Sequence, residues 1–525
     1  MRVAIAAAVL ALSEDVGYER LLEDSLDEVA DVEVSMSGSI PSYAAGSFFL
    51  TGPGRFSMGK EKFTHVFDGF AKVHKWSFKD GKVKFTSKFL PSEFLNNSLA
   101  KNAVDWGVLA QETDPPRKNP GIVGFLKAPN DNQGVNMVQL GSTLELLSDT
   151  TTMLGLDPET LNFKEEVKGM KMSNQSNPFG DVCSQGSAHP YTMEDGSYLS
   201  LREANKLTGP GKERMALYRV HPDNHTVMDT LAYFDVPRAS YSHSFGMTRG
   251  RVGGDLAVVL AQPVYTNMVE LMKTATMKAG FETPEGVGTV IHVVPLDGGE
   301  PVAVEHNAFF FTHFANTWSS GPKKVSFDVA TASYLFMGYF DMGIQRNKTR
   351  RDNWYAEHNN SYSTTMRFEV DLETKQVTEK ELLPKGEACM SELWCNLDLY
   401  KIHPDDEGKD YCGFWAWHTF ANSTAFSSWA VSRVDLCAPG GGRVVAMWKQ
   451  ENVYPSEPTF VPEPGAKDKT AGLVMFKVFD GNKNESRLVV TNATTLETIS
   501  EGVLPIHIPF TVHGRWYDDA GSVLV

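Results

Sequence analysis

Most of the chain alternates apolar and polar residues over short stretches that end at Gly, Pro, Asn or Asp, a pattern typical of half-buried β-strands. Long stretches with helical periodicity are scarce. A strand, a polar turn and a second strand recur seven times, with turn centres 57 to 77 residues apart near Asp80, Asp157, His221, Asp297, Asp371, Asp435 and Asn492. The pattern predicts an all-β fold of repeated units, although β-proteins without repeats also contain such turns.

Seven hairpins in 525 residues predict seven units of about 75 residues each. A four-stranded propeller blade uses about 40 to 50 residues, so each unit keeps roughly 25 to 35 residues for loops. We therefore expect a seven-bladed β-propeller in which long loops cap one face. No Pro/Ser-rich linker or low-complexity tract divides the chain, so we expect residues 31–525 to form a single domain.

The charge of the chain argues against one large class of partners. Its 65 acidic and 49 basic side chains leave a net charge of -16, which disfavours binding to the phosphate backbone of a nucleic acid. A small or apolar substrate is favoured, and no phosphate-binding or dinucleotide-binding glycine motif opens a helix. The cysteines are odd in number and lack a CxxC pair, so we expect free buried thiols and neither a disulfide framework nor a zinc ribbon. They are Cys183, Cys389, Cys395, Cys412 and Cys437.

Residues 1–30 form an N-terminal segment that has two interpretations. Its first 13 residues combine one basic residue, an apolar run and small residues that fit a cleavage site, as in a signal peptide, but an ordinary N-terminal helix fits them too. Sequons such as those at Asn224 and Asn492 permit a secretory route. No apolar run of about 18 residues predicts a transmembrane helix. Cytoplasmic, peripheral-membrane, secretory and plastid locations all stay open.

Four histidines stand in distinctive contexts that are spread over more than 300 residues, so only a fold can gather them. They are His189 in GSAHPY, His243 in SYSHSFGMT, His313 in FFFTHFANTW and His513 in IPFTVHGRW. Four neutral imidazoles would leave the charge of a divalent ion uncompensated, which suits a redox metal with open positions. An ordinary core or surface role is the alternative for each. The four lie in different intervals of the hairpin series, so the innermost strands of a propeller can bring them together at the axis.

Several further motifs occur in order along nearly the whole chain. They are GSFFLTGPGRF and HVFDGFAKVHKWSF near the start, and YPSEPTFVPEPGA and IPFTVHGRW near the end. With the histidine contexts they resemble the carotenoid cleavage oxygenase family, and most closely its animal-type branch of carotene oxygenases and retinoid isomerases. The resemblance implies a seven-bladed β-propeller with a loop and helix cap over an iron site. It also implies that non-haem Fe(II) is bound by His189, His243, His313 and His513.

The family uses three glutamates to orient the metal-binding imidazoles. The resemblance places Asp149 at the first of these positions and Glu392 at another, and it finds no acid for the third near Thr364. Because aspartate is one methylene shorter than glutamate, we expect the contact from Asp149 to need a water bridge or a shifted backbone. A turn or strand-end acid is the alternative role for Asp149.

The implied activity is oxidative cleavage of one C=C bond of a carotenoid or apocarotenoid, with O2 as the second substrate. Three alternatives stay open: a retinoid-type isomerohydrolase, a stilbene-cleaving oxygenase, and a propeller that binds carotenoids without catalysis. The first is weakened because DPPR at residues 114–117 lacks the cysteine of the isomerases' Pro-Asp-Pro-Cys motif. Residues 114–128 join basic Arg117, Lys118 and Lys127 to an apolar stretch, which indicates either peripheral membrane contact or an ordinary surface loop.

Overall fold

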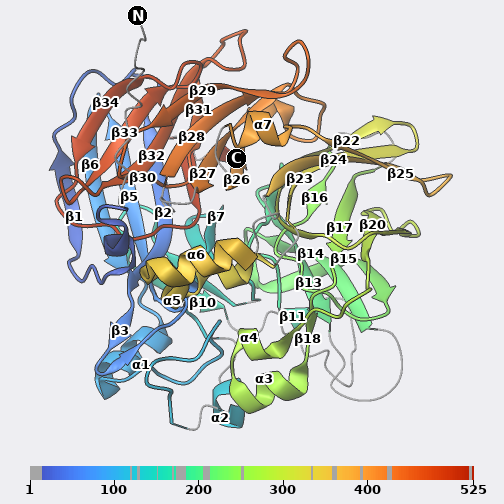
Figure 1. Ribbon diagram of the computed structural model, residues 1–525, viewed down its shortest axis with the longest axis horizontal. Coiled ribbons are helices and arrows are strands. Elements are labelled where there is room, and N and C mark those ends of the chain that lie inside the picture. The colour runs from blue at the N-terminus through green and yellow to red at the C-terminus, as the bar shows by residue number, and fades with distance from the viewer. Residues whose placement is uncertain are drawn as a thin grey trace, which may run out of the picture.

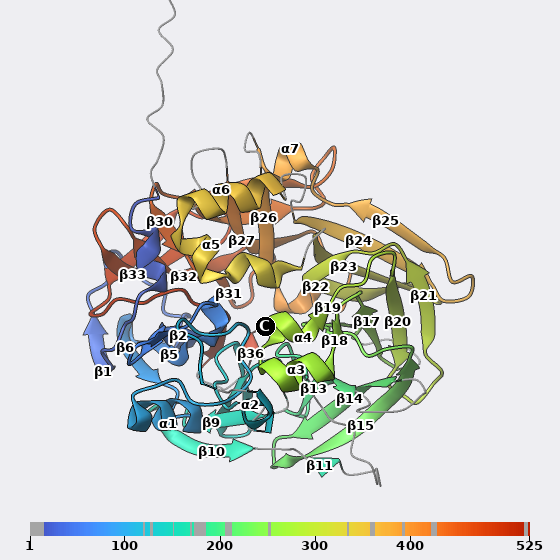
Figure 2. The same cartoon turned by 60° about the horizontal axis from the view of Figure 1, so that its bottom comes forward.

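Seven sheets follow one another around a ring, in chain order from blue to red in Figures 1 and 2. Each sheet holds four to six strands, so the described residues confirm the predicted seven-bladed β-propeller. The structure is a computed structural model. It describes residues 15–118, 121–126, 130–150, 152–167, 171–172, 185–204, 213–249, 254–332, 335–357, 363–390, 394–421, 428–518 and 523–524.

The first four blades use the strands up to residue 306 and, in the first blade, the two C-terminal strands as well. The first blade contains β1 (Val29–Val34), β2 (Gly46–Arg55), β5 (Phe70–Lys79), β6 (Lys82–Phe89), β35 (Gly514–Asp518) and β36 (Val523–Leu524). The second contains β7 (Asn136–Leu140), β8 (Thr143–Leu147), β9 (Met153–Leu156) and β10 (Phe163–Val167). The third contains β11 (Lys171–Met172), β12 (Tyr191–Thr192), β13 (Tyr198–Ala204), β14 (Glu213–His221) and β15 (Asn224–Val236). The fourth contains β16 (Gly246–Met247), β17 (Leu256–Ala261), β20 (Thr289–Pro295) and β21 (Val302–His306).

The last three blades complete the ring. The fifth contains β22 (Phe310–Gly321), β23 (Lys324–Ala332), β24 (Thr364–Asp371) and β25 (Val377–Glu381). The sixth contains β26 (Trp394–Lys401), β27 (Gly413–Ala421), β28 (Ser428–Asp435) and β29 (Arg443–Lys449). The seventh contains β30 (Val453–Pro455), β31 (Thr459–Pro462), β32 (Gly472–Asp480), β33 (Glu485–Asn492) and β34 (Thr498–Val503). Two small ribbons lie outside the blades, β3 (Ser57–Met58) with β4 (Glu61–Lys62) and β18 (Tyr265–Thr266) with β19 (Phe281–Glu282).

Each of the seven predicted turns lies in a different blade, where it joins two antiparallel strands. The turn side chain itself closes several of these hairpins. Asp157 Oδ1 accepts hydrogen bonds from the backbone N–H groups of Glu159 and Thr160, at 3.1 and 2.8 Å. Asp371 and Asn492 accept equivalent bonds. Such turns depend only on residues that are close in sequence, which is why the sequence pattern predicts them.

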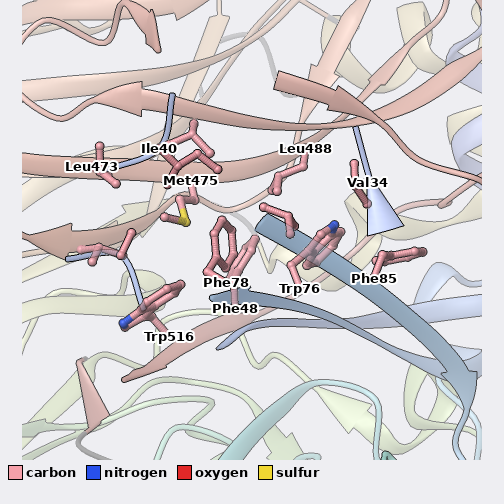
Figure 3. Close-up of a cluster of buried hydrophobic side chains, with 14 of the residues drawn as sticks. Val34, Ile40, Phe48, Trp76, Phe78, Phe85, Leu473, Met475, Leu488 and Trp516 are labelled. Carbon is pink, nitrogen blue, oxygen red and sulfur yellow. The ribbon is translucent and has the colours of Figure 1, made fainter. Parts of the chain in front are cut away.

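The ring closes between the two ends of the chain. Strand β2 pairs with β35, and Phe48 lies opposite Trp516. Figure 3 shows the buried cluster that joins this first blade to the seventh, with Phe48 and Trp76 from one blade and Leu473 and Leu488 from the other. The rings of Phe48 and Trp76 stack at a centroid distance of 5.1 Å. Pairing of strands from the two chain ends within the first blade, together with apolar packing of that blade against the seventh, therefore closes the ring.

Short helices and loops cover one face of the ring, as expected from the roughly 25 to 35 residues of each unit that the blade strands do not use. Figure 2 shows α3, α4, α5 and α6 in front of the strands. The helices of this face are α1 (Glu93–Lys101), α2 (Gly121–Leu126), α3 (Met268–Thr274), α4 (Met277–Gly280), η3 (Phe336–Phe340), α5 (Met342–Arg346) and α6 (Lys348–Glu357). The remaining ones are η1 (Tyr18–Leu22), η2 (Val66–Asp68), α7 (Lys385–Ala388) and η4 (Pro404–Asp406). No helix in the described part of the chain is long and apolar enough to span a membrane.

The expectation of free thiols is wrong for four of the five cysteines. Cys389 is bonded to Cys395, and Cys412 is bonded to Cys437. Cys412 precedes β27 and Cys437 follows β28, so the pairing of these two strands brings the cysteines together. Strand pairing is a tertiary feature that cysteine counting does not reveal. Cys183 and residues 1–14 of the N-terminal segment, whose sequence fits both a signal peptide and an ordinary helix, lie outside the described residues.

Candidate metal centre

The four histidines come from the inner ends of four different blades. His313 lies on β22, the inner strand of the fifth blade. His189 and His243 lie in the loops just before β12 and β16, and His513 directly precedes β35. Because the innermost strands of a propeller converge on its axis, side chains more than 300 residues apart in sequence meet there.

The imidazole nitrogens of these residues form one tight group. Nε2 of His243 lies 3.0 Å from Nε2 of His189 and 3.2 Å from Nε2 of His313. The ring centroid of His513 is 4.5 Å from that of His189 and 5.0 Å from that of His313. One nitrogen from each of the four lies within 4.8 Å of the others. If two nitrogens each lie about 2.1 Å from one ion and the angle between the two bonds is about 90°, the nitrogens are about 3.0 Å apart. The observed spacing therefore fits a shared metal ion.

Three of the four imidazoles bond to a carboxylate through Nδ1. His243 pairs with Asp149 at 2.8 Å, and His313 pairs with Asp398 at 2.9 Å. The third pair is His513 with Glu457. An ionised carboxylate can only accept a hydrogen bond, so Nδ1 carries the proton and Nε2 keeps its lone pair. The Nε2 lone pairs of His243 and His313 therefore face each other across 3.2 Å, an arrangement that repels unless a cation lies between them.

The third carboxylate belongs to Glu457, which accepts a hydrogen bond from Nδ1 of His513 at 3.1 Å. The same side chain accepts a bond of 2.6 Å from the backbone N–H of Gly514 and lies 3.4 Å from the ammonium of Lys401. Glu457 is buried, with 3% of its surface exposed. In the described part of the chain no carboxylate pairs with His189, whose backbone N–H bonds to the Ser187 hydroxyl at 3.1 Å.

The surroundings keep Glu457 ionised and the imidazoles of His189 and His513 neutral. Burial alone would raise the pKa of Glu457, but the charges of Lys401 and His513 and the bond from Gly514 lower that pKa to about 2. Burial lowers the pKa of His513 to about 4, although the nearby carboxylate of Glu457 acts in the opposite direction. Burial also lowers the pKa of His189, with the other three histidines adding to the shift. Neutral imidazoles are the form that binds metal ions.

The carboxylates themselves are fixed in place. Asp149 accepts hydrogen bonds from the Tyr241 hydroxyl at 2.8 Å and from the Ala188 N–H at 3.1 Å. Its contact with His243 is therefore direct, and the shorter aspartate side chain needs no bridging water. Burial would raise the pKa of Asp149, but the charge and hydrogen bond of His243, together with the Tyr241 hydroxyl, bring this pKa below its ordinary value.

Two of these three acids were not found by sequence reasoning. Glu392 lies outside the described residues, and the carboxylate on His313 is Asp398, six positions further along. The segment near Thr364 is the wrong place to look for a third acid, because the acid that pairs with His513 is Glu457. Thr364 bonds Glu381 on the neighbouring strand. The signal for Glu457 was present in the motif YPSEPTF, which places a glutamate among apolar and small residues where a buried charge needs a partner.

An apolar cavity of about 450 Å³ borders this centre. Three of the imidazoles, those of His243, His313 and His513, are part of its wall. The cap supplies most of the apolar lining, which includes Phe125, Met268, Leu271, Phe281, Tyr339 and Phe340. Cavities of about 300 to 1,000 Å³ are typical of small-molecule sites.

Comparison with known proteins agrees with the site geometry. The family described as "Retinal pigment epithelial membrane protein" (RPE65) matches residues 22–518. The chain belongs to this family, the carotenoid cleavage oxygenases. Among curated relatives, the mitochondrial carotenoid-cleaving dioxygenase of Macaca fascicularis is 26% identical over 91% of this chain and 90% of its own length. The beta,beta-carotene 15,15'-dioxygenase of Homo sapiens is 22% identical over 94% of this chain and 93% of its own length.

Solved structures of carotenoid cleavage oxygenases share the fold. Cobalt-substituted Synechocystis apocarotenoid oxygenase superposes with a TM-score of 0.74 at 20% identity, covering 96% of this chain and 98% of its own. A chimera of that oxygenase with RPE65 gives a TM-score of 0.75 at 21% identity, covering 97% and 99%. At such identities the likeness supports the seven-bladed fold alone.

Proposed function

We propose that this chain is a non-haem iron(II) dioxygenase that cleaves one C=C bond of a carotenoid or apocarotenoid into two carbonyl compounds. The observation that carries the proposal is the pair of Nε2 atoms of His243 and His313, which lie 3.2 Å apart. Each imidazole is hydrogen-bonded to a carboxylate, and both line an apolar cavity. The substrate class is supported by the names of relatives that match over more than nine-tenths of this chain, a carotenoid-cleaving dioxygenase and a carotene dioxygenase.

Each side chain of the centre has a defined physical role. His189, His243, His313 and His513 hold the metal, and Asp149, Asp398 and Glu457 orient three of the rings. Bound iron(II) would supply the redox chemistry between dioxygen and an alkene, and four nitrogen ligands leave two of six positions free. The cavity wall excludes water and holds an extended apolar substrate against the imidazoles. The reaction turns one C=C bond and one O2 into two C=O bonds, so it consumes no further oxidant or reductant.

We also infer that helix α2 is where the protein touches a lipid surface. Its side chains Ile122, Val123 and Leu126 are 61%, 40% and 74% exposed. Phe125 and Leu126 also line the cavity, so an apolar substrate leaving a bilayer meets the cavity wall here. Arg117 does not add to a basic face as predicted, because it is buried and paired with Glu112 at 2.8 Å. In a flotation assay with liposomes, wild type should float with the lipid. A variant in which Ile122 and Leu126 are replaced by Ser should stay in the lipid-free fraction.

The decisive experiment compares two buried histidines of the fourth blade. His243 is 6% exposed and His292 is 4% exposed, but only His243 belongs to the centre. Purified wild type, His243→Ala and His292→Ala are loaded with Fe(II) without oxygen and then mixed with carotenoids, apocarotenoids and stilbenes in air. We expect wild type and His292→Ala to bind iron and release carbonyl products. His243→Ala should lose both, as measured by metal analysis and product mass spectrometry.

Other outcomes would overturn the proposal in distinguishable ways. Iron-loaded wild type that binds a carotenoid without turnover would be a binding protein. Release of an isomerised alcohol would indicate an isomerohydrolase, and cleavage restricted to stilbenes would change the substrate class. If His243→Ala kept its iron and its activity, the four-histidine centre would not be the iron site.

A further inference from the structure

A second group of metal-binding side chains lies away from the four-histidine centre, between the second and third blades. It consists of Glu145 on β8, Glu165 on β10 and His225 on β15. Nδ1 of His225 lies 2.8 Å from Oε1 of Glu165 and 3.0 Å from Oε1 of Glu145. One ligand atom from each side chain lies within 4.8 Å of the others.

Strand register builds this group. Glu145 and Glu165 both lie directly opposite Gly155 of β9, one from each neighbouring strand. Residues opposite one another in antiparallel strands point to the same face, so the two glutamates share a face with a glycine between them. A Cβ atom at position 155 would lie 3.0 Å from Oε1 of Glu145 and 2.8 Å from Cγ of Glu165. The glycine therefore leaves open a space that any side chain would fill.

The imidazole is oriented as a ligand. Nε2 of His225 lies 2.9 Å from the backbone carbonyl of Pro222, and a carbonyl can only accept, so Nε2 carries a proton. The other nitrogen, Nδ1, faces the two carboxylates and forms a hydrogen bond of 2.8 Å with Glu165. Glu145 and Glu165 raise the pKa of His225 to about 9, so in the absence of a metal a proton occupies Nδ1, and a metal ion would have to displace it. Metal-bound histidines usually hold their second ring N–H in this way, on a carbonyl or a carboxylate.

Glu145 is the buried acid of this group whose oxygens have the fewest partners. Its side chain is fully buried, at 0% exposure. Neither of its carboxylate oxygens has a hydrogen-bond partner in the described part of the chain, because the 3.0 Å contact with His225 lacks hydrogen-bond geometry. A buried carboxylate without hydrogen bonds requires a counter-charge. A proton on Nδ1 of His225 balances one of the two carboxylates, whereas a divalent cation balances both and contacts the unpaired oxygens of Glu145.

We propose that Glu145, Glu165 and His225 bind a divalent transition-metal ion, with Zn²⁺ as the expected occupant, and that this ion ties the second blade to the third. One imidazole and two carboxylates match the nitrogen and oxygen ligands of zinc and the charge of a divalent ion. Glu165 is 37% exposed, so solvent reaches the site and water completes the coordination. This site uses no residue of the four-histidine centre and does not depend on the proposed oxygenase activity.

The test separates the two sites by disabling the first. In a full-length His243→Ala/His313→Ala background, metal-free protein is titrated with Zn²⁺ at pH 7.5 and followed by native mass spectrometry and calorimetry. We expect one Zn²⁺ per chain and a raised unfolding temperature. Loss of a residue that only orients a metal ligand weakens metal binding by about 10- to 100-fold. Adding His225→Gln removes a ligand itself, so it should weaken zinc binding by more than that. Adding Gly155→Ala should also weaken it, because the methyl group occupies the metal's space while all three ligands remain.

The matched control is His221→Gln in the same background. His221 lies on β14, the strand paired with β15, and pairs at 2.6 Å with a single carboxylate, Asp229. It should leave zinc binding unchanged. The proposal is overturned if the background binds no Zn²⁺, or if His225→Gln and His221→Gln bind it equally. In the first case the group is an ion pair held by a proton. If the background does not fold, wild type answers the question, because two Zn²⁺ per chain should fall to one in His225→Gln.

Discussion

The contact between Asp398 and His313 offers a graded test of the metal centre. Asp398 accepts three hydrogen bonds: 2.9 Å from Nδ1 of His313, 2.8 Å from the N–H of Leu399 and 2.5 Å from the hydroxyl of Thr312. In Asp398→Asn the remaining oxygen can keep the bonds to His313 and Leu399, and the new amide can donate to the Thr312 hydroxyl. The substitution therefore removes the negative charge and preserves the shape, whereas Asp398→Ala removes both.

The sizes of the two effects follow from this geometry. A hydrogen bond to a charged group contributes about 1.5–3 kcal/mol and a neutral one about 1 kcal/mol, so Asp398→Asn should cost about 0.5–2 kcal/mol. That is about a 2- to 30-fold loss of iron affinity. Asp398→Ala frees the imidazole to rotate and should reach the about 10- to 100-fold loss that follows removal of an orienting partner.

Iron affinity is measured by anaerobic competition with a chromogenic Fe(II) chelator, and folding by circular dichroism. The control is Asp328→Asn, which removes an equally buried charge that pairs with Arg367 at 2.8 and 2.9 Å and contacts none of the four histidines. It should lower stability and leave iron affinity unchanged. The reasoning fails if folded Asp398→Ala binds iron within about twofold of wild type, or if Asp328→Asn loses iron equally.

Three further outcomes are expected. Asp149→Glu should keep iron and most of the polyene cleavage, because it restores the acid that the family uses. Loss of iron would show that the backbone at position 149 lies too close to His243 for the longer side chain. Cys412 and Cys437 are 25 positions apart, so replacing both by Ser should lower the free energy of unfolding by about 3–4 kcal/mol in denaturant titrations. An unchanged denaturation midpoint would show that these cysteines do not form a disulfide bond that stabilises the fold. Burial lowers the pKa of Lys477 from 10.5 to about 7, so between these values the unfolded chain binds a proton that the folded protein does not. Stability should therefore rise with pH across that window, and Lys477→Met should flatten the rise; identical pH profiles would contradict the assignment.

The sequence by itself determined the features that depend on neighbours along the chain. The turns at Asp157, Asp371 and Asn492 are visible because each side chain bonds backbone N–H groups two and three residues later. Seven such hairpins predicted seven blades. The four histidines were marked by their sequence contexts, but iron was named only by the family resemblance, because imidazoles alone do not distinguish one transition metal from another.

Only the tertiary structure decided which groups meet. Asp149 and His243 are 94 residues apart, and Asp398 and His313 are 85 apart, so their contacts depend on how the blades are arranged around the axis. A one-residue difference in strand register turns a side chain to the opposite face, so searching the sequence near Glu392 could not single out Asp398. The same dependence on register and blade packing produces the Cys412–Cys437 bond and places His225 against Glu145. Local hydrogen bonds are encoded within a few residues, whereas a site at the centre of a ring exists only once the ring has closed.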